Sequence, residues 1–217
     1  MPHEYAASIT GTVQVSGLYL LTRETDDTEA LLSAVAQAIG GGARVLQYRD
    51  KSTDAGRRLE QAQALVGLCH RHRVPLIVND DVQLARSVGA AGVHLGEHDA
   101  AIATARAELG PSSIIGVSCY NDLSDAAPAV AAGADYIALG AFFDSSTKPR
   151  ARHAPLQLLR DARQFKVPVV AIGGINAANG AALVNAGADA LAVLGAVWDA
   201  PDIGVAARAI SSLFLRA

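Results

Sequence analysis

Short, mainly apolar runs recur along the chain, and each is followed by a segment rich in alanine and leucine, such as 28–39 or 59–72. Runs of this length are typical of strands buried on both faces of a parallel sheet. The predicted strands are 17–22, 42–47, 75–79, 89–95, 114–118, 133–140, 168–172 and 187–195. The pattern therefore predicts eight alternating strand–helix units.

Four of the predicted strands begin with the same Gly-Ala dipeptide, at Gly42, Gly89, Gly133 and Gly187. Glycine suits the left-handed turn that ends a helix, so each marks a helix end followed by a strand. The starts are 47, 44 and 54 residues apart, so the motif returns at every second strand. This favours a closed (β/α)8 barrel, the TIM barrel, whose interior layers are filled by alternate strands; a doubly wound open sheet is the alternative. We expect one α/β domain over 17–217, preceded by an N-terminal extension, 1–16.

Composition supports a folded chain and restricts its partners. Hydrophobic residues make up 51% of the 217 residues and charged residues 18%, which excludes a disordered protein. The net charge of -3 gives no basic field that could hold nucleic acid, so small-molecule partners are expected. Cys69 and Cys119 lie fifty residues apart without Cys-x-x-Cys spacing, so we expect structural thiols in a reducing cytoplasm.

One uncharged stretch, residues 167–188, is long enough to span a bilayer. Pro168 and several glycines and asparagines interrupt it, as expected where a buried strand turns into a helix, so we predict no membrane segment. Residues 1–16 lack the basic start and apolar run of a signal peptide, and a cytoplasmic location is expected. The sequence predicts no particular oligomeric state and is compatible with a homo-oligomer.

The second predicted strand ends in polar residues that alternate along the chain. Gln47, Arg49 and Lys51 point to one side of an extended strand, where a guanidinium fork and a mobile ammonium would form a diphosphate clamp. The alternative is a solvated strand end with ion pairs to Asp50 or Asp54.

Two aspartates end the next two strands. Asp80 and Asp99 are expected to meet at the carboxyl end of the barrel, and paired carboxylates beside a phosphate clamp suit Mg²⁺. Asp81 is predicted to cap the following helix, and the same role is the alternative for Asp99. His94, inside an apolar strand, is expected to be a core histidine with satisfied hydrogen bonds.

Two further regions are candidate parts of the site, one as a lid and the other as a phosphate site. The loop 141–155 is long and rich in hydroxyls and bases, which predicts a lid, with an exposed connector as the alternative. Gly173 and Gly174, with Gly195 one strand later, would offer backbone amides at helix starts, the common phosphate site after strands seven and eight of this barrel.

Together these residues resemble the thiamine phosphate synthase family over about residues 17–198. The motifs are Gln-Tyr-Arg-Asp-Lys at 47–51, Asn-Asp-Asp-Val-Gln-Leu-Ala at 79–85, Gly-Val-His-Leu-Gly-Glu-His-Asp at 92–99, Gly-Val-Ser-Cys at 116–119, and Gly-Ala-Asp-Tyr-Ile-Ala-Leu-Gly through Thr147-Lys148. The resemblance implies joining of 4-amino-2-methyl-5-(hydroxymethyl)pyrimidine diphosphate to a thiazole phosphate, with or without a carboxylate on the thiazole. The products would be thiamine phosphate and pyrophosphate.

The resemblance also implies the site residues. Those for the pyrimidine diphosphate are Gln47, Tyr48, Arg49, Asp50, Lys51, Asn79, Ser118 and Lys148. Those for the thiazole phosphate are Ser145, Ser146, Thr147, Gly174, Leu194 and Gly195. Mg²⁺ would bind Asp80 and Asp99, and the catalytic groups would be Arg49, Lys51, Lys148 and Ser118. No side chain is required as a nucleophile, because Mg²⁺ and the cations would stabilise departing pyrophosphate before the thiazole nitrogen attacks.

Three positions depart from the family pattern. The family usually has Pro-Thr-x-Thr-Lys where this chain has 144–148, Gln in place of Glu97, and Val-Ser in place of Leu194-Gly195. The last change removes a hydroxyl from the implied phosphate site.

Two other functions remain as alternatives. A thiazole tautomerase on the same fold would not need Arg49, Lys51, Asp80 and Asp99 together. A non-catalytic phosphate-binding barrel would keep Gly174 and lose the acids.

Overall fold

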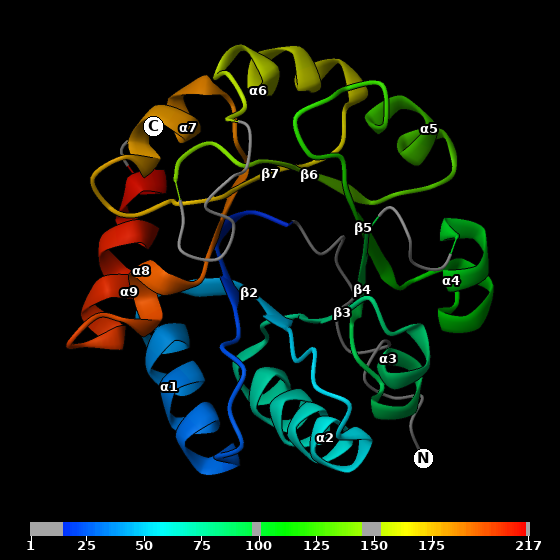
Figure 1. Ribbon diagram of the computed structural model, residues 1–217, viewed down its shortest axis with the longest axis vertical. Coiled ribbons are helices and arrows are strands. Elements are labelled where there is room, and N and C mark those ends of the chain that lie inside the picture. Colours follow the sequence, from blue (N-terminus) through cyan, green and yellow to red (C-terminus); the bar gives the residue numbers. More distant parts are fainter. Residues whose placement is uncertain (1–14, 97–100, 145–152, 216–217) are drawn as a thin grey trace.

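The computed structural model describes residues 15–96, 101–144 and 153–215, and these form a closed barrel of parallel strands (Figure 1). The strands run in chain order around the barrel, and β1 pairs with β8, for example Gly17 with Ala190. The strands are β1 Gly17–Leu21, β2 Ala43–Tyr48, β3 Leu76–Asn79, β4 Gly92–Leu95, β5 Ile114–Ser118, β6 Tyr136–Gly140, β7 Val169–Ile172 and β8 Ala190–Val193. The closure confirms the (β/α)8 prediction, and the open-sheet alternative is wrong.

The helices form an outer ring around the strands (Figure 1). They are α1 Thr28–Gly40, α2 Ala55–His72, α3 Val82–Val88, α4 Ile102–Leu109, α5 Ala126–Ala131, α6 Gln157–Ala162, α7 Gly180–Ala186, α8 Gly195–Trp198 and α9 Ile203–Ser211, with 3-10 turns η1 Arg163–Phe165 and η2 Ser212–Leu215. The described part of the chain contains no helix with both the length and the apolar character needed to cross a membrane.

Aspartates fix where several helices begin. Asp27, Asp54, Asp81 and Asp202 each accept a hydrogen bond from the backbone N–H three residues later, the usual N-cap. The cap at Asp54 starts α2 four residues before the predicted segment 59–72, because the first turn of α2 holds none of the leucines on which that prediction relied.

The repeated Gly-Ala starts have the predicted backbone. All four glycines, at 42, 89, 133 and 187, have positive φ, and Gly89 and Gly187 are the C-cap residues of α3 and α7. In two of the repeats an aspartate follows: the carboxylate of Asp135 accepts from the N–H of Ile115, and that of Asp189 from the N–H of Val169, at 2.7 and 2.8 Å. Each aspartate therefore ties the start of its strand to the preceding strand.

Alternation along the strands divides the core into two regions. One cluster fills the barrel interior, with Tyr19, Val45, Tyr136 and Val170 among its members. The other lies between the strands and the helices and includes Leu20, Leu46 and Tyr48. Val15 is buried in the interior cluster, and residues 1–14 lie outside the described residues, so the predicted boundary at residue 16 stays a prediction.

Candidate active site

The carboxyl ends of the strands and the loops that follow them form one mouth of the barrel, where active sites of this fold are located. Gln47 and Ser118 lie at the ends of β2 and β5, Asn79 is the last residue of β3, and Gly195 begins the helix after β8. The fold thus brings these sequence-predicted residues to one end of the molecule.

The segment after β2 is held against the end of β1. The backbone N–H of Arg49 donates to Thr22 Oγ1 at 2.8 Å, and the N–H of Lys51 donates to Glu24 Oε2 at 3.2 Å. These two bonds hold the backbone of both cationic residues at the mouth. Lys51 Nζ lies 3.4 Å from Asp80 Oδ2, so its ion pair is with the end of β3 and not with Asp50 or Asp54 as in the alternative interpretation.

Tyr48 and Asp50 have their side-chain partners in the helix layer. Tyr48 is 2% exposed, and its hydroxyl donates to Gln61 Oε1 at 3.0 Å. The Asp50 carboxylate, with a side-chain exposure of 1%, pairs with Arg57 at 3.2 Å and accepts from the N–H of Ser52 at 2.7 Å. Burial alone would raise the pKa of Asp50, but the bonds from Ser52 and the Arg57 guanidinium hold it below its ordinary value. Both residues therefore support the Arg49–Lys51 segment from the side of α2, and their implied contact with the pyrimidine diphosphate stays a prediction.

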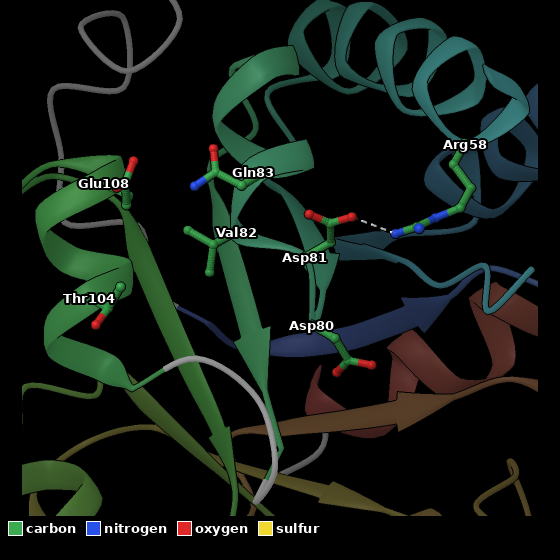
Figure 2. A pocket seen from close by; sticks show the side chains of 7 residues that line it. All are labelled: Arg58, Asp80, Asp81, Val82, Gln83, Thr104 and Glu108. Atoms are coloured by element: carbon green, nitrogen blue, oxygen red, sulfur yellow. Dashed lines mark hydrogen bonds and ion pairs between the residues drawn. The ribbon is translucent and has the colours of Figure 1, made fainter. Parts of the chain in front are cut away.

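Asp80 and Asp81 point in different directions although they are adjacent, as Figure 2 shows. Asp81 caps α3 as predicted, accepting from the N–H of Leu84 at 2.9 Å, and pairs with Arg58 at 2.7 Å. Asp80 has a left-handed backbone with φ of 65°, and its side chain is 34% exposed beside Lys51. This backbone turn directs the Asp80 carboxylate away from the cap position and toward Lys51.

A pocket of about 490 Å³ adjoins Asp80 and Asp81 on the outer side of the mouth (Figure 2). Its other walls come from α2, α3 and α4 and include Arg58, Gln83 and Glu108. Of the predicted site residues that the structure describes, only Asp80 lines this pocket, so the pocket adjoins the predicted site without containing it.

A chain of hydrogen bonds crosses the barrel interior below the mouth. Gln47 Nε2 donates to the Tyr19 hydroxyl at 3.0 Å, and the hydroxyls of Tyr19 and Tyr136 lie 2.7 Å apart. His94 contacts the Tyr136 hydroxyl through Nδ1 and Ser118 Oγ through Nε2, both at 2.9 Å. Five strands contribute to this chain, which begins and ends on residues predicted to bind the substrate.

The interior chain confirms one expectation and adds two residues. His94 is 8% exposed with both ring nitrogens bonded, as expected for a core histidine. Tyr19 and Tyr136 were not identified from the sequence. Their signal is a tyrosine inside an otherwise apolar strand, because a buried phenol hydroxyl needs a partner. Burial raises the pKa of both phenols well above the ordinary value, so both keep their protons.

Gly174 and Gly195, both predicted to bind phosphate, differ in their position relative to the start of a helix. Gly195 is the first residue of α8, as expected. The prediction that Gly174 lies at a helix start is wrong, because α7 begins six residues later, at Gly180. A turn intervenes, in which the N–H of Asn176 donates to Asn179 Oδ1 at 2.9 Å and Asn179 Nδ2 donates to the Gly174 carbonyl at 3.0 Å.

The base of the predicted lid is bonded to the seventh strand. The N–H groups of Phe142 and Phe143 donate to the carbonyls of Ile172 and Gly173 at 3.1 and 3.0 Å. A Cβ on Gly174 would lie 2.2 Å from the Asp144 carbonyl oxygen, so only glycine fits against this loop. Leu194 is the N-cap residue of α8. Five predicted residues lie outside the described residues: Asp99, Ser145, Ser146, Thr147 and Lys148.

The thiols have the predicted structural character. Cys69 and Cys119 are both free and buried. Burial raises the pKa of each thiol to about 12, so neither is a nucleophile at neutral pH. Across the described ranges, 15–96, 101–144 and 153–215, no group of three or more His, Cys, Asp or Glu side chains gathers as a metal cluster.

Comparison with known proteins gives one consistent family. The family model described as thiamine monophosphate synthase matches residues 18–197. The thiamine-phosphate synthase of Thiobacillus denitrificans is 55% identical over 199 residues, covering 91% of this chain and 94% of the relative. The thiamine-phosphate synthase of Chromobacterium violaceum is 53% identical over 201 residues, which cover 93% of this chain and 97% of the relative. Among solved structures, the thiamine phosphate pyrophosphorylase of Pyrococcus furiosus superposes with a TM-score of 0.84 at 32% identity, covering 95% and 98% of the two chains.

Proposed function

Because this chain belongs to the thiamine monophosphate synthase family and is a transferase enzyme, we propose that it joins 4-amino-2-methyl-5-(hydroxymethyl)pyrimidine diphosphate to a thiazole phosphate. In this reaction the bond between the pyrimidine methylene carbon and the diphosphate oxygen breaks, and the oxygen keeps the electron pair. The thiazole nitrogen lone pair then forms the new carbon–nitrogen bond. The products are thiamine phosphate and pyrophosphate.

The observation that carries the proposal is the contact between Lys51 and Asp80. It joins a cation after β2 to an accessible carboxylate after β3, with Nζ and Oδ2 3.4 Å apart. A diphosphate with a divalent cation needs both charges at one place, since the phosphate oxygens bind the ammonium and the metal binds the carboxylate. Asn79, the last residue of β3, lies next to Asp80 and supplies an amide for the same substrate.

Asp80 fits the expected Mg²⁺. Its carboxylate offers hard oxygen ligands and is not used for capping, in contrast to that of Asp81. We propose that Asp80 and Asp99 hold the ion together with substrate phosphate oxygens. When bound, Mg²⁺ would neutralise charge on the diphosphate and make it a better leaving group.

The protein side chains would act by position and charge. Arg49, Lys51 and Lys148 place positive charge where negative charge develops on the leaving diphosphate, and Ser118 donates a hydrogen bond to it. The closely packed interior beneath them, with Tyr19 and Tyr136 at 1% and 0% exposure, excludes water from the pyrimidine side. No covalent intermediate with the enzyme is required.

The second substrate would bind on the opposite part of the mouth. We propose that Ser145, Ser146 and Thr147 contact its phosphate from the loop after β6. Gly174, Leu194 and Gly195 would contact it from the ends of β7 and β8, where backbone amides and close approach are available. The same proposal places the enzyme in the cytoplasm, acting on small molecules.

A direct assay tests this function. Purified protein, both substrates and Mg²⁺ should yield thiamine phosphate and pyrophosphate in equal amounts, and chelation with EDTA should abolish turnover until excess Mg²⁺ is added. Mixtures lacking one substrate serve as controls. Turnover that resists EDTA would reject the metal assignment, and isomerisation of the thiazole compound alone would support the tautomerase alternative.

A further inference from the structure

The interior hydrogen-bond chain connects two residues that lie nearer the mouth than its middle members. Gln47 lies two residues beyond Val45, the register partner of Tyr19. Ser118 lies two residues beyond Gly116, the register partner of Tyr136. The chain therefore descends from Gln47 to the two phenols and rises through His94 to Ser118.

Each member of the chain has few donors, so one bond fixes the next. Because Gln47 Nε2 donates to the Tyr19 oxygen, the single Tyr19 proton is donated to Tyr136. Tyr136 then donates its own proton to His94 Nδ1. A neutral His94 consequently carries its proton on Nε2 and donates it to Ser118 Oγ.

The two ends of the chain are then complementary. With Nε2 of Gln47 bonded to Tyr19, its carbonyl Oε1 is the atom left to accept from a ligand. With Ser118 Oγ accepting from His94, its hydroxyl proton is left to donate to a ligand. If the Gln47 amide were turned over, every bond would reverse: Gln47 would offer N–H groups to the ligand, and the Ser118 proton would point at His94.

A glycine in β5 leaves the space that the hydrogen-bond chain occupies. A Cβ on Gly116 would lie 1.9 Å from Cζ and 2.3 Å from the hydroxyl oxygen of Tyr136, so the phenol crosses the inner face of β5 where only glycine fits. The His94 ring stacks on the same phenol, with ring centroids 5.6 Å apart and planes at 21°. Tyr136 is thus fixed by shape as well as by its hydrogen bonds.

We propose that Tyr19, Tyr136 and His94 are positioning residues that couple the amide orientation of Gln47 to the hydroxyl orientation of Ser118. The inference rests on the proposed function, in which both ends contact one substrate. An aminopyrimidine presents an N–H donor that requires the Gln47 carbonyl, and its diphosphate requires a donor, the Ser118 hydroxyl. One orientation of the chain meets both needs, so recognition of the amino group at one end sets the hydrogen bond to the leaving group at the other.

A cycle of variants tests the coupling. In the full-length enzyme, kcat/KM for the pyrimidine diphosphate is measured for Gln47→Ala, Ser118→Ala and the double variant, each with and without Tyr136→Phe, which keeps the ring. With Tyr136 intact, we expect the fold-loss in kcat/KM of the double variant to be smaller than the product of the two single fold-losses, by a factor of about five or more. We call this factor the coupling factor. With Tyr136→Phe, the losses should multiply.

Tyr48→Phe is the matched control, because it removes another buried phenol hydroxyl, one that bonds Gln61 in the helix layer. Whatever its effect on rate, it should leave the coupling factor unchanged. Coupling that persists in Tyr136→Phe, or that is absent with Tyr136 intact, would overturn the proposal.

A second measurement does not depend on turnover. Nitrogen-15 NMR of the ring of His94, assigned with a His94→Gln variant, should show a neutral imidazole protonated at Nε2 with Nδ1 accepting a hydrogen bond. A doubly protonated ring, or a proton on Nδ1, would overturn the assigned direction. If the enzyme forms no thiamine phosphate while this tautomer is found, the proposed function fails and the hydrogen-bond chain stands.

Discussion

The ring of Tyr136 occupies the space above Gly116, where an added Cβ would lie 1.9 Å from Cζ of the phenol. Tyr136 is fully buried between β5 and the centre of the barrel, so it has no open space into which it could move. The glycine in the Gly-Val-Ser-Cys segment is therefore required by its packing against this phenol.

Gly116→Ala should destabilise the protein and reduce turnover. Overpacking of a core costs about 1–3 kcal/mol, which corresponds to a melting temperature lower by roughly 2–4 °C for each kcal/mol in a chain of this size. Thermal unfolding and the thiamine phosphate assay measure both effects. Gly67→Ala is the control, since its Cβ would meet only Arg71 Nη1 at 3.7 Å within α2, and it should be stabilising by about 0.5–1 kcal/mol. A Gly116→Ala protein as stable as the parent would contradict the packing argument.

Asp50 should make stability depend on pH in the acid range. Its pKa is lower in the folded protein than in the unfolded chain, so its stabilising contribution is complete above the unfolded value, about 3.9, and is lost as pH falls through the lower folded value. Asp50→Asn should lower the unfolding free energy at pH 7 by about 1–3 kcal/mol and flatten the fall below pH 4. Unfolding curves from pH 7 to 3 measure this, with the exposed Asp26→Asn as the control for loss of one charge. Equal acid sensitivity in Asp50→Asn and the parent would exclude the role.

Arg49→Ala and Lys148→Ala should each reduce kcat by about a hundred- to a thousandfold, because each removes positive charge where charge develops on the diphosphate. Steady-state kinetics with both substrates saturating measure the loss. Arg71→Ala, an exposed residue in the last turn of α2, is the control for loss of an arginine far from the mouth. Rates close to the parent in both variants would reject the proposed diphosphate site.

Asp80→Asn separates charge from backbone effects at the metal site. Asparagine tolerates the left-handed backbone of residue 80, with φ of 65°, so the fold should be retained while the charge is lost. We expect half-maximal rate to require about ten- to a hundredfold more Mg²⁺. Asp81→Asn is the matched control, because it keeps a capping side chain on α3 and should leave the Mg²⁺ requirement unchanged. The same Mg²⁺ requirement in Asp80→Asn as in the parent would remove Asp80 from the metal site.

The barrel could be predicted because its signals are local. Helix-ending glycines such as Gly89 and Gly187 and apolar runs between them are visible in the sequence, and the structure places both glycines in the left-handed conformation. The hydrogen-bond chain could not be predicted in the same way. Tyr19 and Tyr136 are 117 positions apart, and neither tyrosine has a neighbour in sequence that indicates its partner.

The roles of Tyr48 and Asp50, which support the clamp formed by Gln47, Arg49 and Lys51, also depend on contacts that the sequence does not reveal. Alternation predicted that Gln47 and Arg49 share a face, and by the same rule Tyr48 and Asp50 belong on the other face. Only the contacts of Asp50 with Arg57 and of Tyr48 with Gln61 reveal that this face is closed by α2. Tyr48 and Asp50 therefore support the clamp from the side of α2, a role that alternation along the strand does not reveal.

Gly195→Ser should restore a hydroxyl that the family pattern places after the eighth strand. A hydrogen bond from that hydroxyl to the thiazole phosphate contributes about 1.5–3 kcal/mol, roughly ten- to a hundredfold in affinity. The Cβ of the serine would lie 3.0 Å from Asp199 Oδ2, a side-chain end that pairs with Arg23 and is 65% exposed, so a small shift of this carboxylate accommodates it. The shift offsets part of the gain.

We therefore expect Gly195→Ser to lower the KM for the thiazole phosphate while the KM for the pyrimidine diphosphate stays nearly unchanged, since we place only one substrate at the eighth strand. Gly195→Ala is the matched control, because it introduces the same Cβ against Asp199 without a hydroxyl and so should raise the thiazole KM or leave it unaltered. Steady-state kinetics with each substrate varied in turn separate the two. If serine and alanine have the same effect in folded protein, residue 195 does not face the phosphate, and the backbone amides at the start of α8 must be assigned to another role.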